Sequence, residues 1–260
     1  MIDFHSHLVP GVDDGAADLD QSREALAAMR AQGVTALVTT PHVRGSQTER
    51  PDELGAFLAQ VDAGFEALRG MAADEFPGLR VERGHEVMLD TPRPDLSDPR
   101  LRLAGTSFVL VEFPFMAVPP HASQVIFDLK MQGWQPVIAH PERYSNVDPT
   151  LAEAAEWRRV GAYLQVNGGS LLGRYGKGAG EVAWDLLRSG MVDYLSSDYH
   201  ARGSLWIAEA VAALVAEGGA EQARLLTEVN PARMLDGQPP EPVPALQRPP
   251  SFWRRLLRRP

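Results

Sequence analysis

The chain of 260 residues contains no cysteine. Without thiols it cannot form disulfide bonds, bind a metal through thiolates or use a cysteine nucleophile. No apolar stretch approaches the roughly 18 residues that a membrane-spanning helix needs. The chain starts with Met1-Ile2-Asp3 and lacks the basic and apolar segments of a secretory signal. We therefore expect a cytoplasmic protein whose chemistry depends on histidine, carboxylate, serine, arginine or a metal.

Positive charge is also scarce, because 25 Lys and Arg residues stand against 34 Asp and Glu residues, a net charge of −9. A broad phosphate-binding surface needs the opposite balance, so we expect no nucleic-acid partner. Hydrophobic residues make up 44% of the chain and charged residues 23%. These fractions are ordinary for a globular protein, and the length is sufficient for one large α/β domain with a full core.

Short β-rich segments alternate with helical segments along the chain. The expected strands cover residues 2–8, 34–40, 79–87, 108–112, 136–140, 163–167 and 192–198. The expected helices cover residues 19–32, 51–68, 122–132, 151–160 and 180–189. This alternation predicts parallel strands joined by right-handed crossovers, in a closed barrel or an open doubly wound sheet.

Titratable side chains recur where the expected strands end. His5 and His7 alternate along the first strand and therefore share a face. The carboxyl ends of parallel strands meet at one edge, where functional residues gather. Carboxylates and imidazoles crowded at the mouth of an apolar core need a cation to neutralise them, so we predict a metal site. Its candidate ligands are His5, His7, Asp14, His42, Glu86, Glu112, His140, Asp198 and His200.

Each candidate also has an ordinary structural reading. Glu86 could be an exposed acid at a strand end, and Glu112 could pair with a neighbouring arginine. Asp198 could cap a helix or a turn, and His42 could be a loop histidine. Taken singly, each residue favours the structural reading, but nine such positions together favour a metal site. The two remaining histidines, His85 and His121, are expected to be structural.

The candidate ligands lie in a set of short motifs. These are H-S-H (5–7), D-D-G (13–15), T-P-H (40–42), G-x-E (84–86), V-E-F (111–113), I-A-H-P-E-R (138–143) and S-D-x-H (197–200). The combination resembles the polymerase and histidinol phosphatase (PHP) superfamily. More narrowly, it is similar to the bacterial metal-dependent tyrosine-protein phosphatases of capsular and exopolysaccharide biosynthesis. The resemblance covers roughly Met1 to Leu235. An H-x-H pair alone is common, whereas I-A-H-P-E-R together with S-D-x-H is specific.

The resemblance implies a distorted (β/α)7 barrel that holds three divalent ions, commonly Mn²⁺. Mixed imidazole and carboxylate ligands also suit Fe²⁺ or Zn²⁺. The loops that follow His42 and His200 depart from the family pattern, which leaves the substrate contacts open. The implied ligands are His5, His7, Glu86 and Asp198 for the first ion, Glu86, Glu112 and His140 for the second, and Asp14, His42 and His200 for the third.

Such a site can hydrolyse a phosphate ester without a protein nucleophile. A water molecule that bridges the ions loses a proton near neutral pH and can attack phosphorus in line. Arg143 is the candidate that binds the phosphoryl oxygens in a bidentate fork, although it could instead be a surface arginine paired with Glu142. A phenolate, whose parent pKa is about 10, leaves readily. His200 could protonate it if that histidine is not held as a ligand.

The preferred function is hydrolysis of phosphotyrosine in a protein. The implied partner is a membrane-anchored tyrosine autokinase that controls polysaccharide export. One alternative is a small-molecule phosphatase of the histidinol-phosphate type, and another is a metal-binding regulatory module without turnover. The D-D-G and I-A-H-P-E-R motifs favour the tyrosine phosphatase, and the complete ligand set argues against the regulatory module.

The carboxyl end of the chain has a different composition. The phosphatase domain is expected to cover residues 1–236 and to close with a helical turn at Asn230–Leu235. Residues 237–250 contain six prolines and are expected to form an extended linker. Residues 251–260 interleave apolar residues with arginines. They could form a short amphipathic contact with the inner face of an anionic membrane, or they could be a disordered basic tail.

Overall fold

The computed structural model describes residues 1–147 and 150–246. The expected basic tail lies outside the described residues, as do residues 247–250 of the expected linker. Within the described ranges, no helix combines the length and the apolar character that a bilayer crossing requires.

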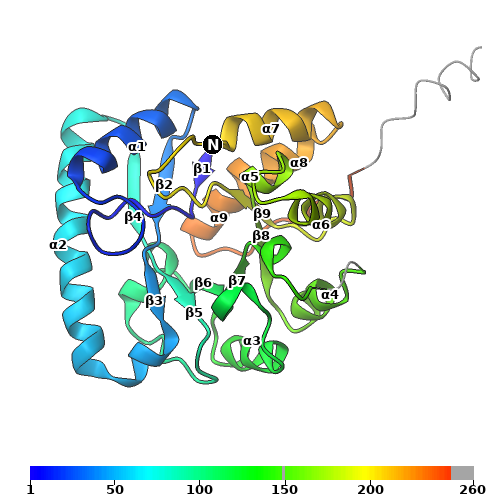
Figure 1. Ribbon diagram of the computed structural model, residues 1–260, viewed down its shortest axis with the longest axis horizontal. Helices are drawn as coiled ribbons and strands as arrows, with labels where there is room; N and C mark the ends of the chain where they lie inside the picture. The colour runs from blue at the N-terminus through cyan, green and yellow to red at the C-terminus, as the bar shows by residue number, and fades with distance from the viewer. Residues whose placement is uncertain (148–149, 247–260) are drawn as a thin grey trace, which may run out of the picture.

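Short strands form two parallel sheets at the centre of the molecule (Figure 1). They are β1 (Ile2–Asp3), β2 (Ala36–Thr39), β3 (His42–Arg44), β4 (Arg80–Arg83), β5 (Glu86–Met88), β6 (Phe108–Glu112), β7 (Gln135–Ala139), β8 (Tyr163–Asn167) and β9 (Tyr194–Ser196). One sheet has the order β1-β2-β4 and the other the order β3-β5-β6-β7-β8-β9. Every pairing is parallel, which confirms the predicted α/β class.

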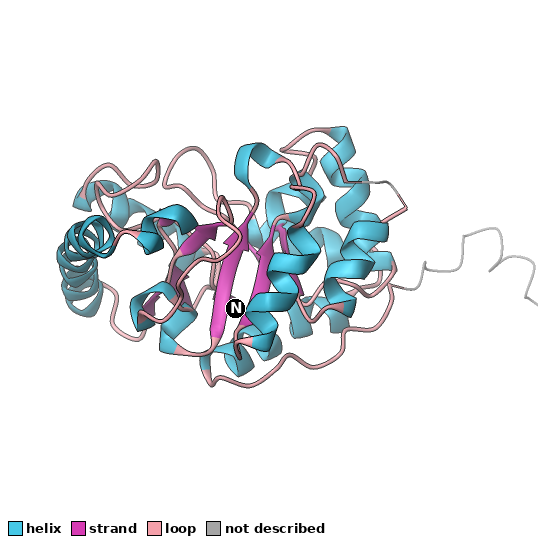
Figure 2. Ribbon diagram, turned by 90° about the horizontal axis from the view of Figure 1, so that it is seen from below, coloured by secondary structure: helices cyan, strands magenta, loops and turns pink. Residues whose placement is uncertain are grey.

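Helices cover the outside of the strands, as the views in Figures 1 and 2 show. They are α1 (Leu19–Ala31), α2 (Pro51–Glu75), α3 (Ala122–Met131), α4 (Ala152–Arg159), α5 (Gly168–Leu171), α6 (Lys177–Arg188), α7 (Ile207–Ala216), α8 (Ala220–Arg224) and α9 (Asn230–Leu235). Two short 3₁₀ turns, η4 (Pro114–Met116) and η5 (Pro141–Arg143), follow strands β6 and β7.

Helix boundaries follow local chemistry. The side chain of Asp18 accepts a hydrogen bond from the backbone N–H of Gln21 and caps α1. Gly33, at a φ of 84°, allows the chain to leave that helix. Helix α2 begins at the predicted residue but continues to Glu75, seven residues further than expected. It does so because Met71 and Ala72 extend its buried apolar stripe.

The two sheets are linked where the chain passes from one to the other. Strand β3 follows β2 closely in sequence, and β5 follows β4 in the same way. At these breaks the N–H of Gly84 donates to the carbonyl of Thr39, and the N–H of Glu86 donates to the carbonyl of Pro41. The interrupted strands therefore remain side by side.

The segment after β1 differs from the prediction, because regular strand structure ends at Asp3 and only an isolated bridge pairs Ser6 with Tyr199. The backbone N–H of Leu8 donates to the side-chain hydroxyl of Thr39 in β2 instead of to a backbone carbonyl. Threonine hydroxyls thus replace part of the expected ladder.

The same segment nevertheless meets the end of β9. The N–H of Asp198 donates to the carbonyl of His5 at 2.9 Å, and the N–H of His7 donates to the carbonyl of Tyr199 at 2.8 Å. The last strand of the larger sheet therefore lies beside the first strand of the smaller one.

The part of the expected linker that the structure describes, residues 237–246, packs against the domain. Val243 and Leu246 are buried in the main apolar cluster. The N–H of Glu241 donates to the side chain of Asn230 in α9, and the N–H of Leu246 donates to the carbonyl of Leu187 in α6. These ten residues are held in place rather than free.

Candidate metal-binding site

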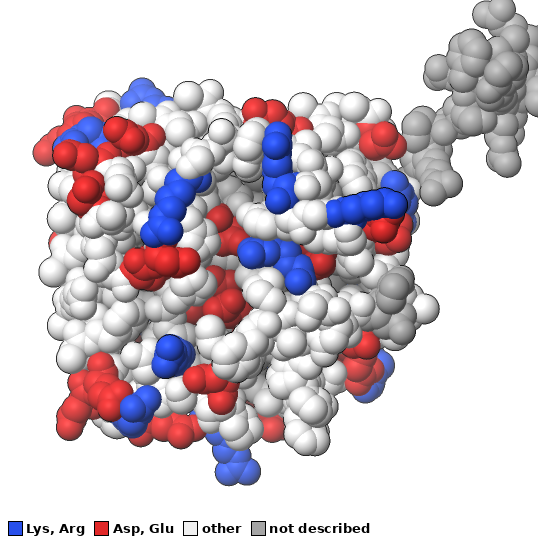
Figure 3. Space-filling model, in the orientation of Figure 1, with Lys and Arg blue, Asp and Glu red and all other residues white. Residues whose placement is uncertain are grey.

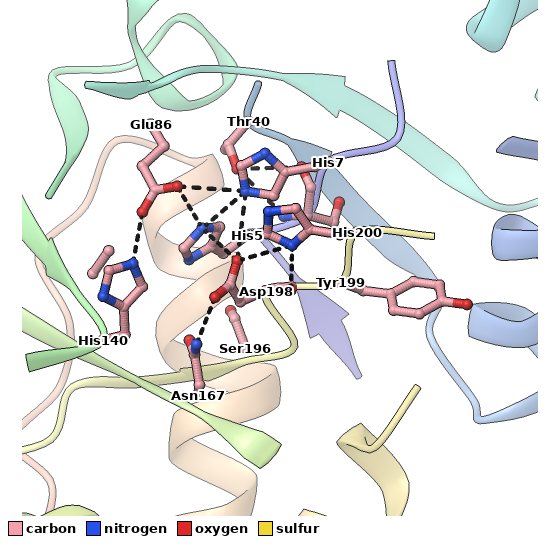
Figure 4. Close-up of polar contacts among 12 residues, drawn as sticks. His5, His7, Thr40, Glu86, His140, Asn167, Ser196, Asp198, Tyr199 and His200 are labelled. Atoms are coloured by element: carbon pink, nitrogen blue, oxygen red, sulfur yellow. Dashed lines mark hydrogen bonds and ion pairs between the residues drawn. The ribbon is translucent and has the colours of Figure 1, made fainter. Parts of the chain in front are cut away.

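The structure brings all nine predicted ligands together. Figure 4 labels His5, His7, Glu86, His140, Asp198 and His200 among them. Most of them are buried, and only Asp14, His42 and His200 have substantial exposed surface. His5, His7 and Asp14 follow β1, His42 and Glu86 begin β3 and β5, Glu112 ends β6, His140 follows β7, and Asp198 and His200 follow β9.

Four of these side chains form a compact group. The Nε2 atom of His5 lies 3.2 Å from Oε2 of Glu86 and 3.3 Å from Oδ1 of Asp198. The Nε2 atom of His7 lies 3.4 Å and 3.5 Å from the same two oxygens, and 3.4 Å from Nε2 of His5. These spacings suit four atoms around one cation with bonds of about 2.0–2.2 Å, the range for zinc with imidazole nitrogen or carboxylate oxygen.

Neighbouring acceptors fix the orientation of the two imidazoles. The Nδ1 of His5 lies 2.8 Å from Oε1 of Gln165, and the Nδ1 of His7 lies 2.8 Å from Oδ2 of Asp13. Because both partners are oxygen acceptors, each Nδ1 carries the proton and each Nε2 faces the carboxylates. Burial opposes the charge on Asp13, but the hydrogen bond from His7 lowers its pKa to about 2.

Three residues that position the site were not found from the sequence, namely Asp13, Gln165 and Asn167. The amide of Gln165 donates to Asn167 at 2.8 Å, and the amide of Asn167 donates to Oδ2 of Asp198 at 2.7 Å. Gln165 and Asn167 could have been found from their spacing at the end of β8. They are two residues apart, as in the H-x-H motif, with amides in place of imidazoles.

Glu86 lies between the first group and a second one. Its Oε2 atom is 3.2 Å from Nδ1 of His42, and its Oε1 atom is 3.0 Å from Nε2 of His140. Glu112 is 3.2 Å from His42 but 4.0 Å from His140. The resemblance places His42 with the third ion only, whereas in the structure its Nδ1 faces Glu86 and Glu112 and its Nε2 faces Asp14 at 3.5 Å.

The third group lies at the more exposed side of the site. The Nε2 atoms of His42 and His200 are each 3.5 Å from Oδ1 of Asp14. The ring of His200 stacks on that of His7 with centroids 4.0 Å apart. Its Nδ1 donates to the carbonyl of Asp198 at 3.0 Å, so its Nε2 atom faces Asp14 with a free lone pair.

The chemistry of this donor set fits divalent cations. Oε2 of Glu86, Oε1 of Glu112 and Oδ1 of Asp198 are buried and have no hydrogen-bonding partner among the described residues. Buried charges without partners are costly, and a cation removes that cost. Burial opposes the charge on His5, but Glu86 and Asp198 raise its pKa to about 9. The negative potential that holds this proton would also stabilise a metal ion.

Two of the predicted ligands are among the residues with a strained backbone. His140 and Asp198 have φ values of 36° and 53°, in the left-handed region that residues with side chains rarely adopt. Such conformations cost of order 1–3 kcal/mol each and persist where the surrounding structure holds them. At His140 this conformation turns the chain from β7 directly into η5.

Arg143 lines a cavity of about 280 Å³ together with seven of the nine predicted ligands. Figure 3 shows acidic side chains in a hollow at the centre of this face, with basic side chains beside it. Arg143 donates to Oδ2 of Asp198 at 2.7 Å and stacks on the ring of Tyr175. It does not pair with Glu142, which turns inward and accepts hydrogen bonds from Ser170. The alternative reading of Arg143 as a partner of Glu142 is therefore wrong.

A parallel α/β fold that gathers imidazoles and carboxylates beside an arginine at a cavity is the architecture of a metal-dependent hydrolase. A model of the capsular polysaccharide synthesis family CpsB/CapC matches residues 1–236. The chain belongs to this family.

Known relatives match almost the whole chain. The tyrosine-protein phosphatase YwqE of Bacillus subtilis is 32% identical over 258 residues, which cover 94% of this chain and 96% of the relative. The tyrosine-protein phosphatase CpsB of Streptococcus pneumoniae is 28% identical over 254 residues, which cover 92% of this chain and 99% of the relative. A structure from a study of YwqE and CpsB, described there as unique metal-dependent tyrosine phosphatases, superposes with a TM-score of 0.79 at 33% identity. It covers 94% of this chain and 100% of that one.

Proposed function

We propose that the protein is a metal-dependent protein-tyrosine phosphatase. The observation that carries this proposal is the group of buried carboxylate oxygens that face imidazoles, have no hydrogen-bonding partner among the described residues and share one cavity with Arg143. Membership of the CpsB/CapC family, and relatives named tyrosine-protein phosphatases over nearly the full chain, support it.

We also propose that the two sheets are parts of one distorted (β/α)7 barrel. If β2 with β3, and β4 with β5, are each counted as one interrupted strand, the described chain contains seven strands. The hydrogen bonds from His7 to Tyr199 and from Asp198 to His5 support closure between the first strand and the last. Closure places all strand ends around one cavity.

We infer that the site holds three divalent ions, with Mn²⁺ as the expected metal and Fe²⁺ or Zn²⁺ as alternatives. When bound, such ions supply a nucleophile by lowering the pKa of water, and they neutralise phosphoryl charge. We propose His5, His7, Glu86 and Asp198 for one ion, Glu86, Glu112 and His140 for a second, and Asp14, His42 and His200 for a third, because a neutral His42 has one lone pair to give.

Arg143 and His200 act on the substrate in this proposal. Arg143 uses one N–H group to bond Asp198 and, within the described part of the chain, keeps the others for the phosphoryl oxygens. The stacked ring of Tyr175 holds the guanidinium in place. The Nδ1 of His200 is fixed by a backbone carbonyl, so its Nε2 either holds the third ion through its lone pair or, when it is protonated and not held as a ligand, passes a proton to the leaving phenolate.

The proposed partner is a phosphotyrosine-bearing protein, specifically a membrane-anchored bacterial tyrosine kinase of polysaccharide export. The protein would meet it in the cytoplasm at the inner face of the membrane, with residues 251–260 in weak contact with anionic lipid. Deleting these residues should reduce co-sedimentation with anionic liposomes at low salt and leave turnover of a soluble phosphopeptide unchanged. Equal co-sedimentation of the full-length and the truncated protein would contradict the proposed membrane contact.

The function is tested by comparing turnover of a phosphotyrosyl peptide and of histidinol phosphate with Mn²⁺. We expect hydrolysis of the peptide to dominate, to stop in excess chelator, to return with Mn²⁺ and to be insensitive to thiol alkylation. Activity that survives chelation, with the metal confirmed absent, would contradict the mechanism. Faster turnover of histidinol phosphate would favour the small-molecule alternative, and binding of metal without turnover would favour a regulatory module.

A further inference from the structure

The cavity has an apolar side that the phosphoryl chemistry does not use. Its lining includes Met88, Phe113, Phe115 and Met116 as well as Arg143 and seven of the nine predicted ligands. Phe113 is buried in the core, where it packs beside Trp157. Phe115 is 97% exposed, the most exposed of the large hydrophobic residues in the described ranges. An aromatic ring at the mouth of a charged site needs an explanation beyond packing, because it contributes almost nothing to the core.

The backbone that presents this ring is strained. Phe115 has φ and ψ of 56° and 25°, and Met116 has a φ of 53°. Left-handed conformations are genuine outliers for bulky residues, and strain of this kind clusters at ligand-binding sites. The strain begins three residues after Glu112, a predicted metal ligand. The turn η4 therefore holds an exposed ring in a costly conformation directly beside the site.

Tertiary hydrogen bonds hold the turn in this conformation. The N–H and the hydroxyl of Ser145 both donate to the carbonyl of Met116, at 2.9 and 3.2 Å. The side chain of Asn146 accepts from the N–H of Val118 at 2.8 Å and donates to its carbonyl at 3.0 Å. Ser145 and Asn146 come two and three residues after Arg143. The segment that presents the ring is thus fastened to the segment that presents the phosphoryl-binding arginine.

We propose that Phe115 and Met116 form an aryl subsite, against which the phenyl ring of the substrate packs while its phosphoryl group lies at Arg143 and the metal-binding groups. This inference rests on the proposed function. It gives a structural reason for the phosphatase to prefer aryl over alkyl phosphate esters. A phenyl ring next to Phe115 gains offset or edge-to-face contact, and the flexible side chain of Met116 adapts to it. An alkyl ester leaves the exposed ring uncovered.

The test measures binding without turnover, so that the easier departure of phenolate does not enter. The full-length, Mn²⁺-loaded protein is titrated calorimetrically with phenylphosphonate and with methylphosphonate, which share the anionic group. We expect the wild type to bind the phenyl compound about tenfold more tightly. Phe115→Ala should reduce this ratio by most of that factor and leave methylphosphonate affinity within about twofold, whereas Phe115→Trp should preserve the ratio.

A matched control is Phe127→Ala, which removes another exposed phenylalanine, on α3, that does not line the cavity. Its ratio should equal that of the wild type. An unchanged ratio in Phe115→Ala, or no preference in the wild type, would overturn the subsite. A protein that shows the preference but does not hydrolyse phosphotyrosyl peptide would disprove the proposed function and keep the subsite. A protein that hydrolyses the phosphotyrosyl peptide but shows no preference for the phenyl compound would disprove the subsite and keep the proposed function.

Discussion

Two buried aspartates lie on either side of strand β9 and have different surroundings. Asp193 precedes the strand, and its carboxylate accepts hydrogen bonds from Arg158 and from the backbone N–H of Leu164. Asp198 follows the strand, and its Oδ1 atom faces His5 without a hydrogen-bonding partner among the described residues. The two aspartates are thus five positions apart, and Asp198 differs in having one oxygen, Oδ2, bonded by Arg143 and Asn167 and the other, Oδ1, without a donor among the described residues.

The pKa values of the two aspartates are shifted in opposite directions. Burial raises the pKa of Asp193, and Arg158 only partly offsets that effect. At Asp198 burial is outweighed by His5 and His7, which hold its pKa well below the usual range. The comparison shows that burial of an acid does not by itself mark a functional site. The informative feature is an oxygen that several imidazoles face but that no donor satisfies.

The largest expected effect comes from Asp198→Asn. The substitution keeps the shape of the side chain but removes a charge from the group that faces His5 and His7. We expect kcat/KM for a phosphotyrosyl peptide to fall by roughly 10³-fold or more, or about 4 kcal/mol of barrier, with less bound metal. Steady-state kinetics and elemental analysis measure the two effects.

The matched substitution at the other end of the strand is Asp193→Asn. It removes the charge that faces Arg158, and hydrogen bonds to charged groups contribute about 2–3 kcal/mol. We expect the free energy of unfolding to fall by about that amount, while metal content and the kcat/KM of the folded protein stay unchanged. The contrast between the two aspartates fails if Asp193→Asn loses metal, or if Asp198→Asn keeps full activity.

A smaller effect on turnover is expected for Arg143→Ala. Removing a phosphoryl contact that strengthens in the transition state should lower kcat/KM by about 10²-fold, with bound metal unchanged. The comparison variant is Arg158→Ala, because Arg158 also bonds a buried aspartate but lies outside the cavity. It should destabilise the fold and leave kcat/KM intact. Near wild-type turnover in Arg143→Ala would remove that residue from the proposed mechanism.

The sequence was sufficient to predict which residues converge, because ligands at the ends of parallel strands must meet at one edge. It did not predict their grouping. His42 belongs to an interrupted strand, and the break between β2 and β3 turns its two ring nitrogens towards different carboxylates. Gln165 and Asn167 escaped notice because neutral amides carry no titration signal.

The exposed ring of Phe115 could not be predicted either. The F-P-F-M segment reads as ordinary apolar sequence after a strand. Its left-handed backbone depends on hydrogen bonds from Ser145 and Asn146, about thirty residues away in the chain. Local patterns carry no information about a conformation that distant groups impose.

The packed segment 237–246 determines where any tether to the rest of the chain begins. The family match ends at residue 236, but burial continues through Val243 and Leu246. A protein cut at 236 would expose the apolar surface that these two side chains cover and would leave the side chain of Asn230 without Glu241. The fourteen residues after Leu246 can span at most about 50 Å. The last described residue, Leu246, is bonded to Leu187 in α6, so the proposed contact of residues 251–260 with anionic lipid would hold the cavity close to the membrane.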